Sequence, residues 1–540
     1  MAVETTPDTN PETSPEAGPT PPADAKPRFR RLKRGLLIVG SILVVCALVF
    51  GGGALWLYVK TDIDTVGKVA FTNELAVPPL APSRIDEQGR RVFNLRMLAG
   101  STEFRPGRQT QTWGFNGSYL GPTLRAARGE QVVVNVENTL PEASSVHWHG
   151  MHLPAAMDGG PHQMVDSGAK WSPTWRIDQP ASTLWYHPHP HGTTERHVQR
   201  GLAGMFILDD PQAAALALPK DYGDDDIPVI VQDVRFDGDS FDHGRGLFAS
   251  SSGFLGDRIL VNGTLGAYKT VDDELVRLRL LNASTARIYD FGFDDKRAFS
   301  LVATDGGLVE RPAAMDRIRL SPGERAEIVV RMKPGEKTVL RTFPLDIGLG
   351  LWDQRMNGGD DTFDVLQLRA AEKLRPSAAL PGELTRLQLP TGQVPAQTRR
   401  FELLGVEING KGMDMNRIDQ TVVRGTEEVW EVRNADGAAH SFHVHDTQFK
   451  VLDVNGKTPP VPLRGAKDTV LITPGSTVRI ALRFDGPADP DTPYMYHCHL
   501  LYHEDSGMMG QFVVVNPGQQ AGTPPRHEPA GPGAGAHAHP

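Results

Sequence analysis

The stretch from His497 to Met508 constrains the fold more than any other part of the sequence. It follows Tyr494-Met495-Tyr496, an aromatic run that is typical of a β-strand. Successive side chains on a strand point to opposite faces, so His497 and His499 face one way and Cys498 faces the other. The fold must therefore hold a thiol and two imidazoles back to back, as two metal positions joined by one short piece of backbone.

The residues that follow Cys498 complete one of these two positions. His503 and Met508 stand at spacings that let the chain turn back toward the thiol. Two histidines, one cysteine and a weak axial methionine form the ligand set of a blue-copper electron-transfer site. Such a thiolate would pass electrons through its own backbone to whatever His497 and His499 hold. The alternative is a buried, inert cysteine among ordinary histidines, and three further histidine clusters argue against it.

Ten of the 18 histidines fall in four compact motifs. Each His-x-His pair places two imidazoles on one face of a strand. Eight imidazoles could surround three copper ions, which together could supply electrons to dioxygen. Zinc is an alternative, but its sites usually close with four ligands. The motifs are His147-Trp148-His149, His187-Pro188-His189, His440-Ser441-Phe442-His443-Val444-His445 and His497-Cys498-His499 with His503.

His440 does not follow this pairing, because it precedes His443 by an odd number of positions. On an extended strand it faces away from His443, toward the side of Cys498. Parity therefore divides the ten histidines into eight for one cluster and two, His440 and His503, for the thiolate site. We interpret the remaining histidines as structural, surface or tail residues: His152, His162, His191, His197, His243, His527, His537 and His539.

The chain from residue 61 onward consists of short apolar or alternating runs bounded by turn signals, which predicts an all-β protein. Three Asn-Gly turns stand 146 and 147 residues apart, and each precedes a strand that ends in asparagine. We therefore predict three consecutive β-sandwich domains at about 75–215, 225–372 and 395–517, followed by a flexible tail at 518–540. The turns begin at Asn116, Asn262 and Asn409, and the strands end at Asn138, Asn282 and Asn434.

The N-terminal region predicts a membrane anchor. Residues 1–35 read as a disordered cytoplasmic tail with a basic flank, and residues 36–59 are uncharged and long enough to cross a bilayer as a helix. The basic flank predicts a single-pass protein in the cell membrane, with its catalytic domains on the extracytoplasmic side. The alternative is a signal peptide that is cleaved before secretion.

Charge and cysteine content exclude some classes of protein. The formal net charge is −9, and this balance does not suggest a nucleic-acid partner. The two cysteines, Cys46 and Cys498, cannot form a disulfide framework.

At these motifs the chain resembles the three-domain multicopper oxidases, a family that includes laccases, bacterial cuprous oxidases and bilirubin oxidases. The resemblance extends over residues 75–517 and includes Gly121-Pro122-Thr123 and the run 200–204. It implies three cupredoxin-like Greek-key domains and four copper ions. The implied type 1 ligands are His440, Cys498, His503 and Met508, the type 2 ligands are His147 and His443, and the type 3 ligands are His149, His187, His189, His445, His497 and His499.

The resemblance also implies roles for three carboxylates. Asp158 and Glu504 match proton carriers for the formation of water. Asp436 matches a carboxylate that orients a copper-ligating imidazole. An ordinary turn or surface acid is the alternative for each.

The implied reaction couples one-electron oxidation of a reductant to the four-electron reduction of dioxygen to water. The reductant would be a phenolic or aromatic compound, or Cu(I) or Fe(II). A dedicated cuprous or ferrous oxidase is one alternative, although Met413 and Met415 are too few to resemble a long methionine-rich insert. A nitrite reductase would have two repeats and no type 3 pair. A non-catalytic copper-binding envelope protein is the alternative from another class, and some relatives that have lost the ligands serve in cell division.

Overall fold

The structure is a computed structural model that describes residue 18 and residues 26–244 and 250–525. The chain divides into two units, Met1–Lys60 and Thr61–Pro540. The predicted tails fall largely outside the described residues, as do His527, His537 and His539.

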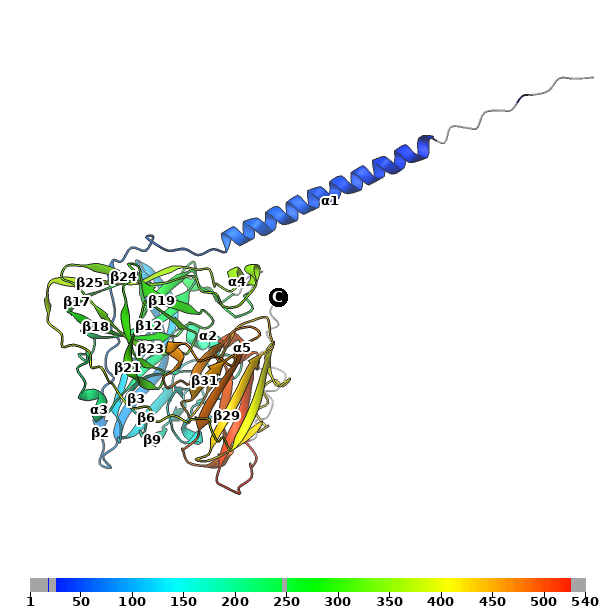
Figure 1. Cartoon of the computed structure of the whole chain (residues 1–540). Coiled ribbons are helices and arrows are strands. Elements are labelled where there is room, and N and C mark those ends of the chain that lie inside the picture. The colour runs from blue at the N-terminus through cyan, green and yellow to red at the C-terminus, as the bar shows by residue number, and fades with distance from the viewer. Residues whose placement is uncertain (1–17, 19–25, 245–249, 526–540) are drawn as a thin grey trace, which may run out of the picture. The chain divides into compact units, whose positions relative to one another are not determined.

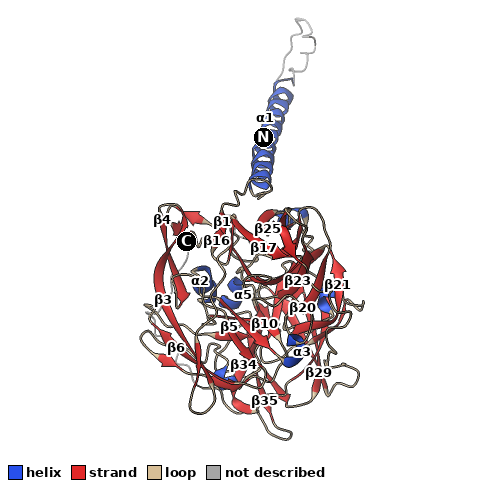
Figure 2. Cartoon of the chain, turned by 90° about the vertical axis from the view of Figure 1, so that its left-hand side faces the viewer, coloured by secondary structure: helices blue, strands red, loops and turns tan. Residues whose placement is uncertain are grey.

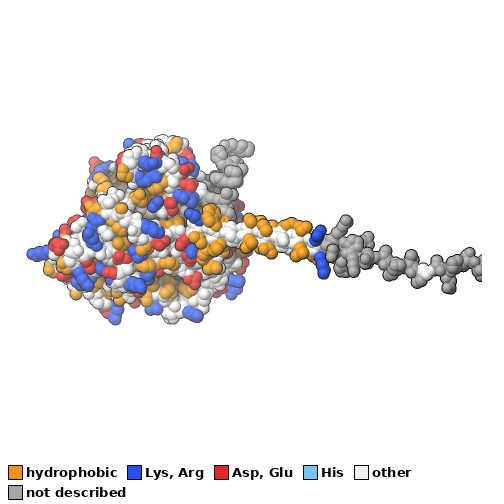
Figure 3. Space-filling view, turned by 90° about the horizontal axis from the view of Figure 1, so that it is seen from above, with side chains coloured by type: hydrophobic (Ala, Val, Ile, Leu, Met, Phe, Trp, Pro, Cys, Tyr) orange, Lys and Arg blue, Asp and Glu red, His pale blue; other side chains and the backbone are white. Residues whose placement is uncertain are grey.

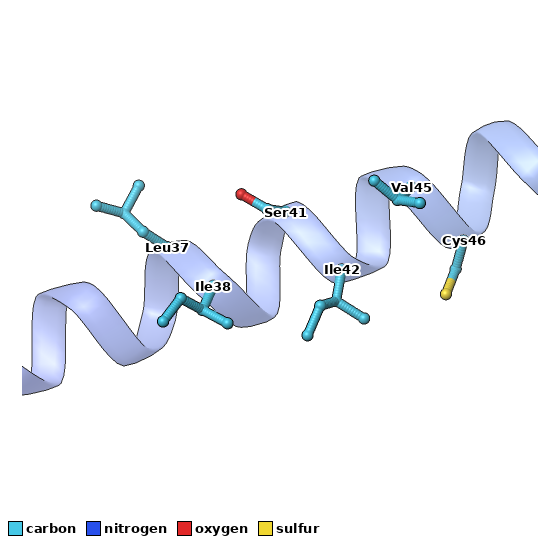
Figure 4. Close-up of a pocket in the computed structure, with 6 residues that line it drawn as sticks. All are labelled: Leu37, Ile38, Ser41, Ile42, Val45 and Cys46. Atoms are coloured by element: carbon cyan, nitrogen blue, oxygen red, sulfur yellow. The ribbon is translucent and has the colours of Figure 1, made fainter.

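The first unit contains the long helix α1 (Lys26–Lys60). Its part from Leu32 to Lys60 is long and apolar enough to cross a membrane, and its side chains are exposed along the whole length (Figure 3). The helix begins ten residues before the predicted span and so includes the basic flank. One exposed face is lined by the apolar and small side chains Leu37, Ile38, Ser41, Ile42, Val45 and Cys46 (Figure 4). A helix of this length and apolar composition is typical of a membrane span or a signal sequence.

The second unit is built almost wholly of β-strands, as predicted (Figures 1 and 2). Its sheets form three successive pairs, which we call the first, second and third repeats. The first repeat contains β2 (Ser83–Ile85), β3 (Arg91–Arg105), β4 (Arg108–Phe115), β6 (Gln131–Asn138), β8 (Lys170–Trp171) and β9 (Thr174–Arg176) in one sheet, and β5 (Leu124–Ala127), β11 (Gly204–Asp209), β10 (Ser182–His187) and β7 (His147–His149) in the other.

The second repeat has two larger sheets. One contains β1 (Asn73–Glu74), β17 (Ala267–Asp273), β25 (Phe363–Arg375), β24 (Lys337–Thr342), β19 (Tyr289–Phe293) and β22 (Arg317–Leu320). The other contains β16 (Thr264–Leu265), β15 (Arg258–Val261), β12 (Asp226–Val234), β18 (Leu275–Asn282), β23 (Arg325–Arg331), β20 (Phe299–Thr304) and β21 (Gly307–Met315), and β13 (Phe236–Asp237) pairs with β14 (Ser240–Phe241) beside them.

The third repeat has two five-stranded sheets. They contain β27 (Glu407–Ile408), β26 (Gln397–Leu404), β29 (Glu427–Asn434), β33 (Thr477–Arg483) and β31 (Lys450–Val454), and β28 (Gln420–Val423), β35 (Met509–Val515), β34 (Asp489–Cys498), β30 (His440–Val444) and β32 (Thr469–Ile472). In each repeat the two sheets enclose one hydrophobic core.

The predicted Asn-Gly turns form the same hydrogen bonds in all three repeats. Asn116, Asn262 and Asn409 each have positive φ, which asparagine tolerates better than most residues. Their side chains hold β3, β12 and β26 respectively. In each case Oδ1 accepts from a backbone amide of that strand, and Nδ2 donates to the carbonyl of the residue two positions before that amide, at 2.7–3.1 Å. The repetition in the sequence is therefore a repetition of structure.

The three strand-ending asparagines are also equivalent, and we call them the frame asparagines. Asn138, Asn282 and Asn434 each accept one backbone amide and donate to two carbonyls, one of them 27 or 38 residues further along the chain. Their strands pair in parallel with β3, β12 and β26 respectively. Asn282 and Asn434 thus fasten the two sheets of their repeats together at one end, whereas Asn138 holds the loop segments at Glu142 and Val165.

Helices are few and short outside α1. They are α2 (Thr194–Gln199), α3 (Pro211–Ala214), α4 (Leu351–Met356) and α5 (Leu501–Asp505), with 3₁₀ turns at Ala155–Met157 and Val461–Leu463. The sequence analysis did not predict α5, which carries His503 and Glu504.

Candidate metal centres

Antiparallel pairing brings the His-x-His motifs together in twos. In the first repeat His147 of β7 lies opposite His187 of β10. In the third repeat His443 of β30 lies opposite His497 of β34. Since directly opposed residues share a face of the sheet, each repeat gathers four imidazoles at one end of its sandwich.

The two sets of imidazoles face each other across the boundary between the first and third repeats. His147 stacks on His445 with ring centroids 3.9 Å apart, and His149 stacks on His443 at 3.8 Å. All eight rings are buried, with at most 1% of any residue exposed. The structure thus brings together the eight histidines that strand parity assigned to one cluster.

Hydrogen bonds fix the orientation of several rings. The Nδ1 atoms of His147, His187 and His443 contact the carbonyls of Asp158, Pro188 and Asp468 at 2.8–3.0 Å, so their Nε2 atoms point inward. Among the described residues these three Nε2 atoms have no hydrogen-bond partner, although buried polar atoms nearly always have one. A metal ion explains such unpartnered nitrogens, and the donor set fits copper.

Two further observations support a bound cation. The Nε2 atom of His497 lies 3.2 Å from that of His189 and 3.3 Å from that of His445, so three ring nitrogens converge on one point. Burial and the neighbouring imidazoles lower the pKa of most of these rings, to about 4 for His445, and neutral rings are the form that binds metal. The other rings with a lowered pKa are His149, His187, His189, His443 and His499.

Asp158 connects ligands from both repeats. Its Oδ2 lies 2.7 Å from Nδ1 of His445, and its Oδ1 lies 3.4 Å from Nδ1 of His147. Burial alone would raise the pKa of this carboxyl, but the two imidazoles lower it below its ordinary value. Asp158 is therefore an ionised hydrogen-bond acceptor at the centre of the interface.

Glu504 holds an equivalent place on the other side of the cluster. Its two oxygens lie 3.2 Å from Nδ1 of His189 and 3.2 Å from Nδ1 of His497. Burial raises the pKa of the carboxyl, and the two imidazoles outweigh that effect and bring it down to about 2. Like Asp158, Glu504 contacts one ring from each repeat.

Sequence reasoning missed a third buried carboxylate, Asp468. Its Oδ1 lies 3.1 Å from Nε2 of His149, and Arg325 of the second repeat binds both its oxygens at 2.7 Å. Gly323 lies beside it, where a Cβ would come within 3.1 Å of His149 and His499. The second repeat has no ligand histidine, but it closes the back of the cluster. A buried aspartate needs a partner, and the partner of Asp468, Arg325, lies far away in the sequence. The sequence around Asp468 therefore gave no sign of its role.

The second group of ligands lies on the opposite side of β34. The Cys498 Sγ atom is 3.6 Å from Nδ1 of His440 and 3.6 Å from Nδ1 of His503, and these two nitrogens are 3.1 Å apart. All three side chains are buried. Burial raises the pKa of the Cys498 thiol to about 12, so the thiolate forms there only when a cation binds. His440 faces this group, as its odd spacing predicts.

Met508 enters the same core as Cys498. Its carbonyl accepts from the Cys498 amide at 3.1 Å, and its side chain is completely buried in the cluster that contains Cys498. Met509 instead pairs with His497, and so shares the face of the histidine cluster. This register favours Met508 over Met509 as the axial residue.

The far nitrogens of the two thiolate-site imidazoles point in different directions. Nε2 of His440 lies 3.4 Å from Asp436, whose pKa is brought down to about 2, chiefly by its contact with His440. Nε2 of His503 lies 2.7 Å from the carbonyl of Ser251, in the second repeat. Asp436 thus lies where a ring-orienting carboxylate was expected.

The five histidines predicted to be structural or surface residues lie apart from both groups. His197 contacts Glu142 and Ser144, His243 contacts Gln199, and His162 contacts Gln511. Within residues 26–244 and 250–525, neither these three nor His152 and His191 belong to a set of converging ligand atoms.

Three consecutive β-sandwiches, with a buried thiolate site in the third and a histidine cluster shared between the first and third, define a multidomain copper protein of cupredoxin-like architecture. Sequence profiles of the multicopper oxidases match residues 98–213, 221–339 and 380–518. The chain belongs to the multicopper oxidase family, which confirms the predicted fold class and the resemblance.

Similar proteins include oxidases and a cell-division protein. Multicopper oxidase mco of Staphylococcus epidermidis is 35% identical over 455 residues, which cover 82% of this chain and 93% of that protein. A laccase-like multi-copper oxidase CueO from Ochrobactrum sp. is 35% identical with a TM-score of 0.74, and the match covers 82% of this chain and all of that one.

Cell division protein FtsP of Escherichia coli K12 is 36% identical over 451 residues, covering 82% of this chain and 93% of FtsP. Overall similarity therefore does not separate an oxidase from a cell-division protein. The inference must come from the ligand side chains themselves.

Proposed function

We propose that this protein is a copper-dependent oxidase that couples one-electron oxidation of a reducing substrate to the four-electron reduction of dioxygen to water. One observation carries the proposal: ten histidines and Cys498 form two buried groups that are joined by the three residues 497–499. A protein without turnover has no need for this connection.

We assign four copper ions to these groups. The thiolate site would hold one ion and the histidine cluster three. The proposed type 1 ligands are His440, Cys498, His503 and axial Met508, the type 2 ligands are His147 and His443, and the type 3 ligands are His149, His187, His189, His445, His497 and His499. Bound copper would supply one-electron chemistry at the first group and the reduction of dioxygen at the second.

Three carboxylates would orient ligand imidazoles, and two of them would also supply protons. Asp158 and Glu504 hold Nδ1 atoms of ligand imidazoles from both repeats, which keeps Nε2 free for metal. The same two carboxylates lie against the cluster and could take up and release the protons required to form water. Asp436 would orient the ring of His440.

Two classes of reductant are candidates. The Ochrobactrum protein has oxidase activity towards lignin model compounds, which favours a phenolic or aromatic reductant here. A dedicated cuprous or ferrous oxidase would use metal ions, and Met413, whose amide donates to the Gly507 carbonyl at 2.8 Å, is the nearest support for that alternative.

We further propose that α1 is retained as a single-pass anchor and that the β-domains lie on the extracytoplasmic side of the cell membrane. The support is the length and exposure of Leu32–Lys60 together with the preceding basic residues. A cleaved signal sequence is the alternative, and it would leave a secreted protein.

The test is to load the full chain with copper, count the ions per molecule, and measure oxygen uptake with a phenol, Cu(I) and Fe(II). We expect four ions, an intense blue absorption and uptake of one dioxygen per four electrons. A fully loaded protein that consumes no oxygen with any of the three would instead support a non-catalytic role for this chain, and the similarity to a cell-division protein would then be the better guide.

A further inference from the structure

The segment that follows α1 is fastened to the second repeat and is not a loose linker. We call residues 61–74 the strap. Asp62 pairs with Arg355 of α4, the Ile63 amide donates to Asp361 Oδ1 at 3.1 Å, and β1 adds in parallel to the edge of β17. The first of these contacts begins only two residues beyond the end of α1, a span of about 7 Å of extended chain. The strap is thus held against the second repeat and forms part of the β-unit.

The segment that binds the strap, α4 with Asn357, also binds the residues that lie over the thiolate site, Ser250 and Ser251. Arg355 lies in α4, and Asn357 directly follows that helix. The Asn357 side-chain oxygen accepts from the hydroxyls of Ser250 at 2.7 Å and Ser251 at 3.0 Å. The Ser251 carbonyl in turn accepts from Nε2 of His503 at 2.7 Å. A short, continuous series of contacts therefore joins the strap to a ligand of the thiolate site.

The same region presents an apolar tip. Leu351 and Trp352, which open α4, are 78% and 40% exposed. Tryptophan is enriched at membrane–water interfaces, where its ring can be apolar on one side and wet on the other. Ser251, the residue above His503, is also exposed. One edge of the β-unit thus contains the apolar pair Leu351 and Trp352, the strap, and the surface over His503.

We propose that Leu351 and Trp352 insert into the lipid interface and hold the His503 edge at the membrane surface, where the reductant is a hydroquinone dissolved in the bilayer. This inference rests on the proposed oxidase function and on retention of α1. A hydroquinone needs an apolar surface for its ring and a hydrogen-bonding group for its hydroxyls, and the α4 tip and Ser251 supply both. The hydrogen bond between Ser251 and His503 is the route for the electrons.

The electrons and protons of this reaction balance. Each hydroquinone loses two electrons and two protons and becomes a quinone. Two hydroquinones therefore supply the four electrons and four protons that convert one dioxygen into two waters, and no other reductant is needed.

The second edge of the thiolate site suits a different reductant and provides an internal reference. There His440 faces Asp436, a carboxylate whose side chain is 22% exposed. A carboxylate disfavours an apolar molecule and attracts a cation or a polar, water-soluble donor. Water-soluble reductants should therefore be oxidised independently of the α4 tip.

A binding measurement tests the membrane contact without any turnover. The full chain is placed in phosphatidylcholine vesicles with and without brominated acyl chains, and tryptophan fluorescence is compared between the wild type and Trp352→Phe. Bromine should quench a component of the emission that is absent from Trp352→Phe. Equal quenching in the two proteins would overturn the proposal.

A kinetic measurement tests the substrate class. In the same vesicles, oxygen uptake is recorded with a long-chain hydroquinone confined to the bilayer and with the chainless, water-soluble hydroquinone. Leu351→Glu should lower the ratio of the two rates about tenfold, because a charge replaces the apolar contact. Val394→Glu is the matched control, since Val394 is 88% exposed and lies outside this edge.

The outcomes separate the two proposals. An unchanged ratio in Leu351→Glu, with both hydroquinones still oxidised, rejects the membrane route and leaves the oxidase intact. No oxygen uptake with either hydroquinone or with a phenol rejects the oxidase itself.

Discussion

The second and third repeats share one frame and differ in what the frame carries. In each, the frame asparagine donates to the carbonyl of a residue in the opposite sheet, Leu320 in one repeat and Ile472 in the other. Tyr289 lies opposite Leu320, and His440 lies opposite Ile472. The register therefore aligns Tyr289 with a thiolate-site ligand, and by the same count it aligns Gly292 with His443.

The second repeat offers no imidazole at either aligned position, and at Gly292 it has no space for a side chain. A Cβ at Gly292 would lie 2.7 Å from Cδ of Arg317, and Tyr289 is completely buried with its hydroxyl 2.8 Å from that of Ser284. The frame asparagines and strand register thus determine the sandwich, whereas a few side chains placed on it determine the metal centres. The repeat without ligands contributes Arg325, Gly323 and Ser251 as supports.

The largest expected effect removes the ligand that most distinguishes the third repeat. Cys498→Ser should abolish the blue absorption and the oxidase activity, because a hydroxyl is a poor ligand for this copper and the connection to His497 and His499 is lost. Circular dichroism should remain that of a β-protein. Cys46→Ser, in α1, is the matched control and should retain both properties. Turnover of an organic reductant by Cys498→Ser would contradict the assignment.

The second prediction removes a frame asparagine and leaves every candidate ligand in place. Asn282→Ala removes three buried hydrogen bonds, two of them to the carbonyls of Arg287 and Leu320. Denaturant unfolding should show a loss of about 3 kcal/mol, with normal blue absorption in the protein that remains folded. Asn516→Ala, at an exposed position, should change neither. If the variant lost copper but kept its stability, Asn282 would be needed for the metal centres themselves and not only for the sandwich that carries them.

The third effect concerns the carboxylate shared between the first and third repeats. Asp158→Asn keeps the size of the side chain but cannot carry a proton, and general acid assistance is typically worth ~10²–10⁴-fold. We expect full copper content, a blue site that reduces at the normal rate, and turnover that falls at least about tenfold. Stopped-flow reoxidation of the reduced enzyme by oxygen is the measurement. Reoxidation at the wild-type rate would move the proton role to Glu504.

The fourth effect tunes the thiolate site without removing it. Met508→Leu should keep the blue colour and raise the reduction potential, because a weak donor is lost while the three strong ligands stay. Potentiometric titration of the blue band measures the change. Met509→Leu is the control, since Met509 faces the other side of its strand. If Met508→Leu lowers the potential and Met509→Leu raises it, the axial assignment is reversed.

The smallest effect lies in the first repeat, away from any ligand. His197 and Arg196 bring the pKa of Glu142 down to about 2 from 4.5. A lowered carboxyl pKa stabilises the folded state above pH 4.5, and the stabilisation is lost as the pH falls toward 2. Glu142→Gln should therefore cost less than about 1 kcal/mol at neutral pH, since the pair is partly exposed. The difference between wild type and variant should disappear in acid, and a constant difference would show that charge is not the cause.

The grouping of the candidate ligands could be predicted from the sequence because it depends on local strand parity. On β34 alternation alone separates Cys498 from His497, and the odd spacing of His440 identifies its side. The supports could not be predicted in the same way. Arg325 reaches Asp468 across 143 residues, and Ser251 reaches His503 across 252, with no motif at either end. The short helix α5 and the strap likewise depend on tertiary packing more than on local propensity.

The stacking of His147 on His445 and of His149 on His443 has a consequence for biosynthesis. The four ligand histidines of the first repeat leave the ribosome ~250 residues before the first of their partners in the third, a delay on the order of ten to fifty seconds at ordinary rates of elongation. During that time a half-cluster exists with no counterpart. A chain that is cut short at any point before His499 can fold its first sandwich but cannot assemble the full cluster. Under the proposed oxidase function, dioxygen could therefore be reduced at the full cluster only after His499 has been added to the chain.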